Sequence, residues 1–74
     1  MKARFKYDDI VRVQPGVIIK SRPGERAWIV GIFENRPQGE YFESFPPGVV
    51  YSIEFEDGYS TEIHESDLEL EVGN

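Results

Sequence analysis

From position 49 to position 56 every second residue is apolar, and positions 52, 54 and 56 are polar, which is the period of a half-buried β-strand. The face expected to be buried consists of Val49, Tyr51, Ile53 and Phe55. The pair Asp57-Gly58 follows directly and is typical of a two-residue hairpin turn. Residues 59–65 alternate again, with Tyr59, Thr61 and Ile63 expected inside and Ser60, Glu62 and His64 outside. The pattern predicts an antiparallel hairpin.

Three more segments are predicted as strands. Residues 9–13 form a short first strand, and residues 27–33 form a second that is apolar throughout, which predicts cover on both faces. Gly31 inside this second strand indicates a bend or a bulge. Turns are expected at Pro15-Gly16 and Pro23-Gly24. A 3₁₀ turn at residues 66–68 would precede a last strand at residues 69–72.

The longest predicted loop, residues 35–48, contains three Pro and two Gly. Long loops inside compact domains are often functional. Tyr41, Phe42 and Phe45 lie in it among acidic residues, and aromatic anchors ringed by charge are the usual anatomy of an interface hot spot. We expect this loop to contact a protein partner. An alternative stays open, in which Phe42 and Phe45 close one end of the core, because a chain this small needs most of its aromatic side chains there.

Five short strands and the scarcity of Ala and Leu predict a single all-β domain over residues 1–74. The pieces that carry a family likeness are residues 7–13, 27–32, 51–58 and 65–69. In this order they resemble a small five-stranded SH3-like barrel of the Tudor and KOW type. They are also similar to small bacterial immunity proteins, which neutralise toxins and include SH3-like members. The likeness implies a fold, and a fold of this kind hosts many unrelated functions.

The charges divide at residue 36. All eight Lys and Arg residues lie in the first 36 positions beside four acids, a balance of +4. Residues 37–74 contain ten acids and neither Lys nor Arg, a balance of −10, and the two sum to the net charge of −6. An acidic half of this kind attracts basic partners and repels phosphate backbones. The charge division therefore predicts a basic protein partner.

Catalysis and metal binding are not expected. The chain has no Cys, and its one His, His64, is predicted to be a solvated residue on an outer strand face. Ser60, His64 and Asp67 are sequence neighbours and do not suggest a convergent catalytic triad. The acids around the hairpin lack EF-hand spacing. We expect a non-enzymatic protein with no catalytic residue, metal site or cofactor.

Two other binding classes remain as alternatives. KOW-like barrels often bind nucleic acid, and Lys2, Arg4 and Lys6 alternate like one strand face, but ten uncompensated acids disfavour phosphate contact. Tudor-like barrels bind methylated Lys or Arg in aromatic cages, for which Tyr41, Phe42, Phe45 and Tyr51 are candidates. The chain would then be an accessory module for nucleic acid or a modified peptide. A third alternative is a small subunit of a larger enzyme complex.

The favoured interpretation is an immunity or antitoxin-type module that blocks a basic protein such as a nuclease toxin. Carboxylates in such inhibitors occupy the place of substrate phosphates. The residues expected to bind the partner are Tyr41, Phe42, Phe45, Glu54, Glu56, Asp57, Glu62 and Glu65. No apolar run reaches signal-peptide or membrane-span length, which predicts a cytoplasmic protein without membrane contact. The oligomeric state stays open.

Overall fold

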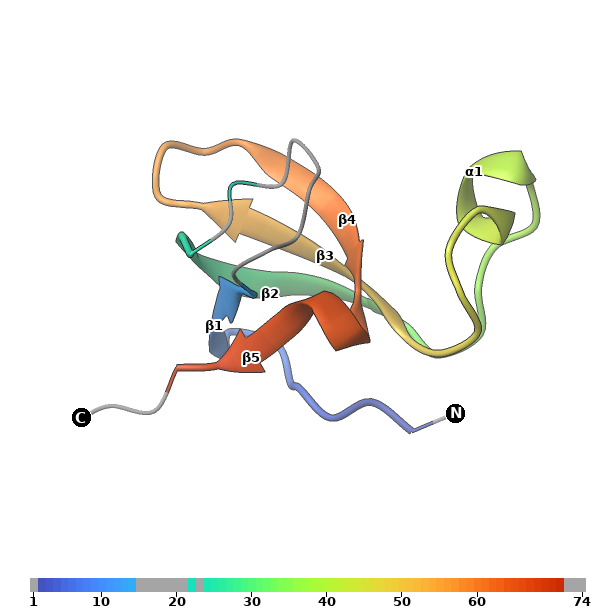
Figure 1. Ribbon diagram of the computed structural model, residues 1–74, viewed down its shortest axis with the longest axis horizontal. Helices are drawn as coiled ribbons and strands as arrows, with labels where there is room; N and C mark the ends of the chain where they lie inside the picture. The colour runs from blue at the N-terminus through green and yellow to red at the C-terminus, as the bar shows by residue number, and fades with distance from the viewer. Residues whose placement is uncertain (1, 15–21, 23, 72–74) are drawn as a thin grey trace.

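The computed structural model describes residues 2–14, 22 and 24–71, and within them it contains one antiparallel sheet of five strands. The strands follow the order β4-β3-β2-β1-β5, so the last strand pairs with the first (Figure 1). The all-β prediction is confirmed. The strands are β1 (Ile10–Val13), β2 (Arg26–Phe33), β3 (Val50–Phe55), β4 (Ser60–His64) and β5 (Leu68–Leu70). A short helix, α1 (Glu40–Glu43), interrupts the predicted long loop, and a 3₁₀ turn (Glu65–Asp67) precedes β5.

The predicted hairpin of β3 and β4 is present, but its turn is one residue longer than expected. The backbone N–H of Phe55 donates to the carbonyl of Tyr59 (2.8 Å), and the N–H of Gly58 donates to the carbonyl of Phe55 (2.9 Å). Gly58 has a φ of 89°, whereas Asp57 is not among the residues with positive φ. A two-residue type I′ turn needs positive φ at both positions. The connection is therefore a three-residue loop, residues 56–58, with Gly58 in the left-handed position.

Gly31 lies at the predicted bulge in β2. The register with β3 shifts between Ile29 and Gly31, which leaves Val30 as the extra residue. A Cβ atom built on Gly31 would lie 3.0 Å from the Cβ of Ser52, so the two strands approach too closely there for a larger residue. The bulge also exposes 44% of Val30. The prediction that β2 is covered on both faces is therefore wrong for this part of the strand.

The main core lies on one face of the sheet. In β3, the alternation places Tyr51, Ile53 and Phe55 inside, as predicted. In β4, Ile63 is buried, but Tyr59, which precedes the strand, is 42% exposed and stacks on Phe55 with ring centroids 6.0 Å apart. Its predicted inward position is wrong because it belongs to the end of the turn. The other members of the core are Phe5, Val11, Val13, Ala27, Ile29, Val49 and Leu68.

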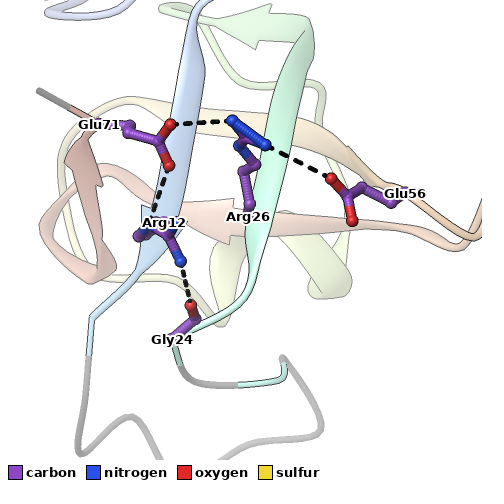
Figure 2. Close-up of polar contacts among 5 residues, drawn as sticks. All are labelled: Arg12, Gly24, Arg26, Glu56 and Glu71. Carbon is purple, nitrogen blue, oxygen red and sulfur yellow. Dashed lines mark hydrogen bonds and ion pairs between the residues drawn. The ribbon is translucent and has the colours of Figure 1, made fainter. Parts of the chain in front are cut away.

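Ion pairs fasten the ends of the strands at one side of the sheet (Figure 2). Glu71, which follows β5, accepts from Arg12 Nε of β1 (2.9 Å) and from Arg26 Nη2 of β2 (3.1 Å). Arg26 also lies 3.6 Å from Glu56 Oε2, and Arg12 donates to the carbonyl of Gly24 (3.0 Å). These arginines are thereby engaged within the fold.

Some predictions fall outside the described residues. The turn at Pro15-Gly16 lies wholly there, as does Pro23 of the second expected turn. The end of the last predicted strand, Val72, lies there too. Among the helices that the structure describes, none combines the length and apolar character needed to cross a membrane.

Candidate protein-binding surface

One arginine holds the loop that carries the predicted aromatic anchors. The guanidinium of Arg36 donates five hydrogen bonds to four backbone carbonyls of the loop. These carbonyls belong to Phe42, Phe45, Pro46 and Gly48. The guanidinium presents several donors in a fixed plane, so one side chain can fix both ends of the loop. No sequence signal indicates this role of Arg36, because its acceptors are backbone groups that every residue type possesses.

Four rings pack together beside the sheet and form the aromatic cluster, defined as Phe33, Tyr41, Phe42 and Phe45. Ring centroids lie 5.1 Å apart for Phe33 and Phe42, 5.2 Å for Tyr41 and Phe42, and 5.6 Å for Tyr41 and Phe45. All three pairs meet edge to face, the favoured geometry for aromatic contacts. Tyr41 is 53% exposed, whereas Phe42 and Phe45 are half-buried.

The aromatic cluster belongs to the sheet face that is opposite the main core. Phe33 pairs with Val50 in the β2–β3 register, and Val50 pairs with His64 in the β3–β4 register. Val50 is fully buried, yet it is not part of the main core cluster. The loop therefore covers one end of this second face and forms a small apolar centre of its own. Phe42 and Phe45 help to build this centre, and Tyr41 is its most accessible ring.

Glu62 joins this loop to the strands. The Tyr41 hydroxyl donates to Glu62 Oε1 (2.8 Å), and Ser52 Oγ donates to Glu62 Oε2 (2.9 Å). Partial burial and, next, the hydrogen bond to Glu62 raise the pKa of Tyr41 above its ordinary value of 10.0. The hydroxyl thus remains a donor at neutral pH. Within the described residues, Glu62 is the one acid predicted to bind the partner that forms a hydrogen bond with an aromatic residue predicted to do so.

Glu54 lies on the same outward face as Glu62. It pairs with Trp28 of β2 in one register and with Ser60 of β4 in the other. Its side chain is exposed and forms no ion pair with any residue that the structure describes. Glu54, Glu62 and the aromatic cluster therefore share one side of the molecule, which we call the aromatic–acidic surface.

Glu56 and Asp57 lie beyond this surface, at the hairpin turn, and each has an arginine partner. Glu56 pairs with Arg26, and Asp57 accepts from Arg22 Nη1 (2.9 Å). The pKa of Asp57 is lowered, first by the hydrogen bond from the backbone N–H of Tyr59 and then by Arg22. The Arg22 guanidinium lies 4.6 Å from the Tyr59 ring centroid, a cation–π contact. These two acids are partly neutralised within the fold.

Glu65 has a structural role that the sequence did not reveal. Its Oε2 accepts from the Tyr51 hydroxyl (2.5 Å) and from the backbone N–H of Arg4 (3.1 Å). The Tyr51 hydroxyl in turn accepts from the N–H groups of Arg4 (3.0 Å) and Phe5 (3.2 Å). Burial and the hydrogen bond to Glu65 raise the pKa of Tyr51 to about 12. This network fixes the N-terminal segment to β3 and lies apart from the aromatic–acidic surface.

The prediction that His64 is a solvated surface residue is wrong. The side chain is 9% exposed because the loop covers the end of its face. His64 Nε2 lies 3.0 Å from the carbonyl of Pro47, which can only accept, so Nε2 carries the hydrogen. Nδ1 is then the acceptor for the backbone N–H of Ser66 (3.1 Å). The ring is a bridge between the loop and the 3₁₀ turn, with both nitrogens engaged.

The aromatic cage that the Tudor likeness implies does not form as expected. Tyr51 lies in the main core and packs on Phe5, with ring centroids 5.3 Å apart. The rings of Tyr41, Phe42 and Phe45 contact one another and do not surround a space for a cation. Within residues 2–14, 22 and 24–71, no group of three or more Asp, Glu or His side chains could hold a metal ion.

The arrangement thus offers an exposed tyrosine with a polar tip, half-buried rings around it, and carboxylates beside it. Aromatic rings bordered by charged groups are typical of contacts between proteins. Comparison of the chain with protein-family models, with curated proteins and with solved structures finds no match.

Proposed function

We propose that this protein is a non-enzymatic binding module that holds a basic protein partner on the aromatic–acidic surface. The observation that carries the proposal is the 2.8 Å hydrogen bond from Tyr41 to Glu62, because it joins the loop anchor and the strand carboxylates into one surface. Tyr41 would be the central anchor, and Phe42 and Phe45 would hold its ring in place through their edge-to-face contacts with it. Glu54 and Glu62 would supply the charge.

The distribution of ion pairs supports a basic partner. Arg12, Arg22 and Arg26 pair with carboxylates, and Arg36 is occupied by loop carbonyls. The three arginines in ion pairs are therefore not available to neutralise the aromatic–acidic surface, and Arg36 directs its guanidinium at the loop carbonyls rather than at Glu54 or Glu62. Negative potential over such a surface raises the rate of encounter with positive partners.

The finer proposal is an immunity or antitoxin-type role against a basic toxin such as a nuclease, acting in the cytoplasm. Its support is the resemblance to SH3-like immunity proteins, together with the strand order β4-β3-β2-β1-β5 and the 3₁₀ turn before β5, which suit an SH3-like barrel. A partner that normally binds phosphates would meet carboxylates in their place.

Site-specific photo-crosslinking in the native host tests the proposal. A benzoylphenylalanine at Tyr41 should capture a protein of basic pI, whereas the same group at Leu70 should not. Leu70 is a matched control because it is 49% exposed and lies in β5, away from the surface. Capture of an acidic protein, or equal capture at both positions, would contradict the proposal. If the captured protein is a nuclease, its activity should fall on stoichiometric addition of this chain.

A further inference from the structure

A groove separates the N-terminal segment from the far half of β2, outside the aromatic–acidic surface. Its volume is about 610 Å³, within the range of roughly 300–1,000 Å³ typical of ligand sites. Ile32 contributes apolar surface, Phe5 borders the groove but is only 3% exposed, and Tyr7, which is 61% exposed, stands beside them. Lys2 and Lys6 line the same groove.

The groove exists because the N-terminal segment leaves β2 after one pair of backbone hydrogen bonds. Asp8 N–H donates to the carbonyl of Ile29 (2.9 Å), and Ile29 N–H donates to the carbonyl of Asp9 (3.1 Å). Nearer the N-terminus, the N-terminal segment contacts the chain that follows β2 through a hydrogen bond from the N–H of Ala3 to the carboxylate of Glu34 (2.6 Å). Figure 1 shows the N-terminal segment running toward the end of the molecule where α1 lies.

The hydrogen-bonding groups of Ile32 face this groove. Hydrogen bonds between antiparallel strands alternate in direction along each strand. The backbone of Phe55 is hydrogen-bonded to that of Tyr59 in the hairpin, so the backbone groups of Phe55 point toward β4. Every second residue of a strand directs its backbone groups to the same side, so those of Tyr51 also point toward β4. Ile32 is opposite Tyr51 in the register and therefore directs its N–H and C=O away from β3. Among the described residues, neither group has a hydrogen-bond partner.

The charge of the groove is opposite to that of the molecule. Lys2 and Lys6 are exposed and form no ion pair with any described residue. The one acid in the lining, Glu34, is already bound to the N–H of Ala3. The lining thus has a balance of +1 in a chain whose net charge is −6. Charges beyond about 10 Å are largely screened at ordinary salt, so a ligand in the groove experiences the two ammonium groups and the nearby carboxylates of Glu34 and Asp9 more than the net charge of the chain.

We propose that this groove binds an extended acidic peptide segment of a partner protein. The peptide backbone would pair with the free N–H and C=O of Ile32, as in β-strand addition to a sheet edge. Its carboxylates would contact Lys2 and Lys6, and an apolar side chain would rest on Ile32 beside Tyr7. An extended peptide supplies both the backbone groups and the carboxylates, whereas the sugar–phosphate backbone of a DNA strand supplies acceptors but no donor for the C=O of Ile32. This site is separate from the surface of the proposed function and does not depend on it.

The test is a titration with an eight-residue peptide in which Glu alternates with Thr and Val. We expect a saturable shift of the Ile32 amide in nitrogen–proton correlation spectra and slower hydrogen exchange at that amide. K6Q should weaken binding by about two- to fivefold, the range for one exposed ion pair. R4Q is the matched control, because it removes the same charge from the same segment at a residue that does not line the groove. It should bind the peptide as the unmodified chain does.

Three further arms make the result decisive. A peptide with Gln in place of Glu should bind several-fold more weakly, and one methylated on the backbone nitrogens should lose the shift at Ile32. Well-dispersed spectra of K6Q would show that the variant is folded. Absence of binding at millimolar peptide, or equal losses in K6Q and R4Q, would overturn the proposal. Binding of an eight-nucleotide oligothymidylate in place of the peptide would also overturn it and indicate a nucleic-acid groove.

Discussion

The imidazole of His64 occupies the space that a side chain at Gly48 would need. A Cβ atom on Gly48 would lie 2.8 Å from His64 Nε2, which is closer than such contacts occur. Gly48 also has a φ of 132°, a backbone conformation that other residues rarely adopt. The loop therefore reaches its position over the sheet only because this residue lacks a side chain.

G48A should therefore destabilise the protein through two effects. Positive φ alone costs about 1–3 kcal/mol for a residue with a side chain, and the contact with His64 adds to it. G39A separates the effects, because Gly39 has a φ of 134° but an added Cβ there would meet nothing within 4 Å. Denaturant unfolding should show a larger loss of unfolding free energy for G48A than for G39A. Equal losses would show that the His64 contact has no energetic weight.

R36K should loosen the aromatic loop and leave the main core intact. Lysine keeps the charge, but its ammonium group cannot reach four carbonyls arranged around a planar fork. Partly buried carbonyls would lose charged hydrogen bonds, and the loss of stability should be about 2 kcal/mol. Hydrogen exchange should accelerate at residues 40–48 and stay slow at Ile53. Unchanged exchange in the loop would mean that other contacts hold it.

E54K should slow association with the partner and leave folding unchanged. Glu54 is exposed and has no ion-pair partner within the described residues, so its reversal removes attraction without breaking a contact. We expect an association rate that is roughly two- to tenfold lower, with the difference shrinking as salt rises.

E69K is the control for this measurement, because Glu69 is also exposed but lies in β5. Stopped-flow or surface-binding kinetics on the captured partner would measure both rates. The same decrease in both variants would indicate an effect of net charge rather than of the aromatic–acidic surface.

Stability should fall in alkaline solution as Tyr51 ionises. Its pKa is raised from 10.0 to about 12 in the folded protein, so the unfolded chain releases this proton at lower pH. The contribution of Tyr51 is complete below pH 10 and is lost as pH rises to about 12. Two pKa units correspond to a loss of up to about 3 kcal/mol.

Y51F provides the comparison for this pH dependence. Phenylalanine keeps the ring in the core but has no proton to release, so the slope of unfolding free energy between pH 10 and pH 12 should be shallower. Chemical denaturation at several pH values would measure both slopes. Equal slopes in the two proteins would show that groups other than Tyr51 cause the loss of stability at alkaline pH.

The sequence predicted the parts of the fold that depend on local alternation. Val50–Phe55 and Ser60–His64 form a hairpin because side-chain direction in a strand has a period of two, which can be read directly from the sequence. His64 was placed on the correct face of its strand, but its burial depends on the loop that crosses that face. Such cover is decided by residues far away in the chain, so alternation cannot reveal it.

The candidate site was predictable only in part. Tyr41 and Glu62 were both selected, but their contact depends on the path of residues 35–48, which contain the unpredicted α1. The net charge of a sequence segment does not distinguish a free carboxylate from one that is paired within the fold. In the structure, Asp57 has an arginine partner and Glu65 has a hydroxyl partner, so their roles differ from that of Glu54.

The bonds of Arg36 have a consequence for how this protein can change. They end on backbone carbonyls, which every amino acid possesses, so this part of what holds the loop does not depend on the side chains that the loop displays. Substitutions at the exposed positions Glu40 and Glu43 can then alter partner choice without remodelling the chain beneath them. Related chains that keep this arginine and the glycine at position 48 are therefore expected to diversify their specificity through the helix between them.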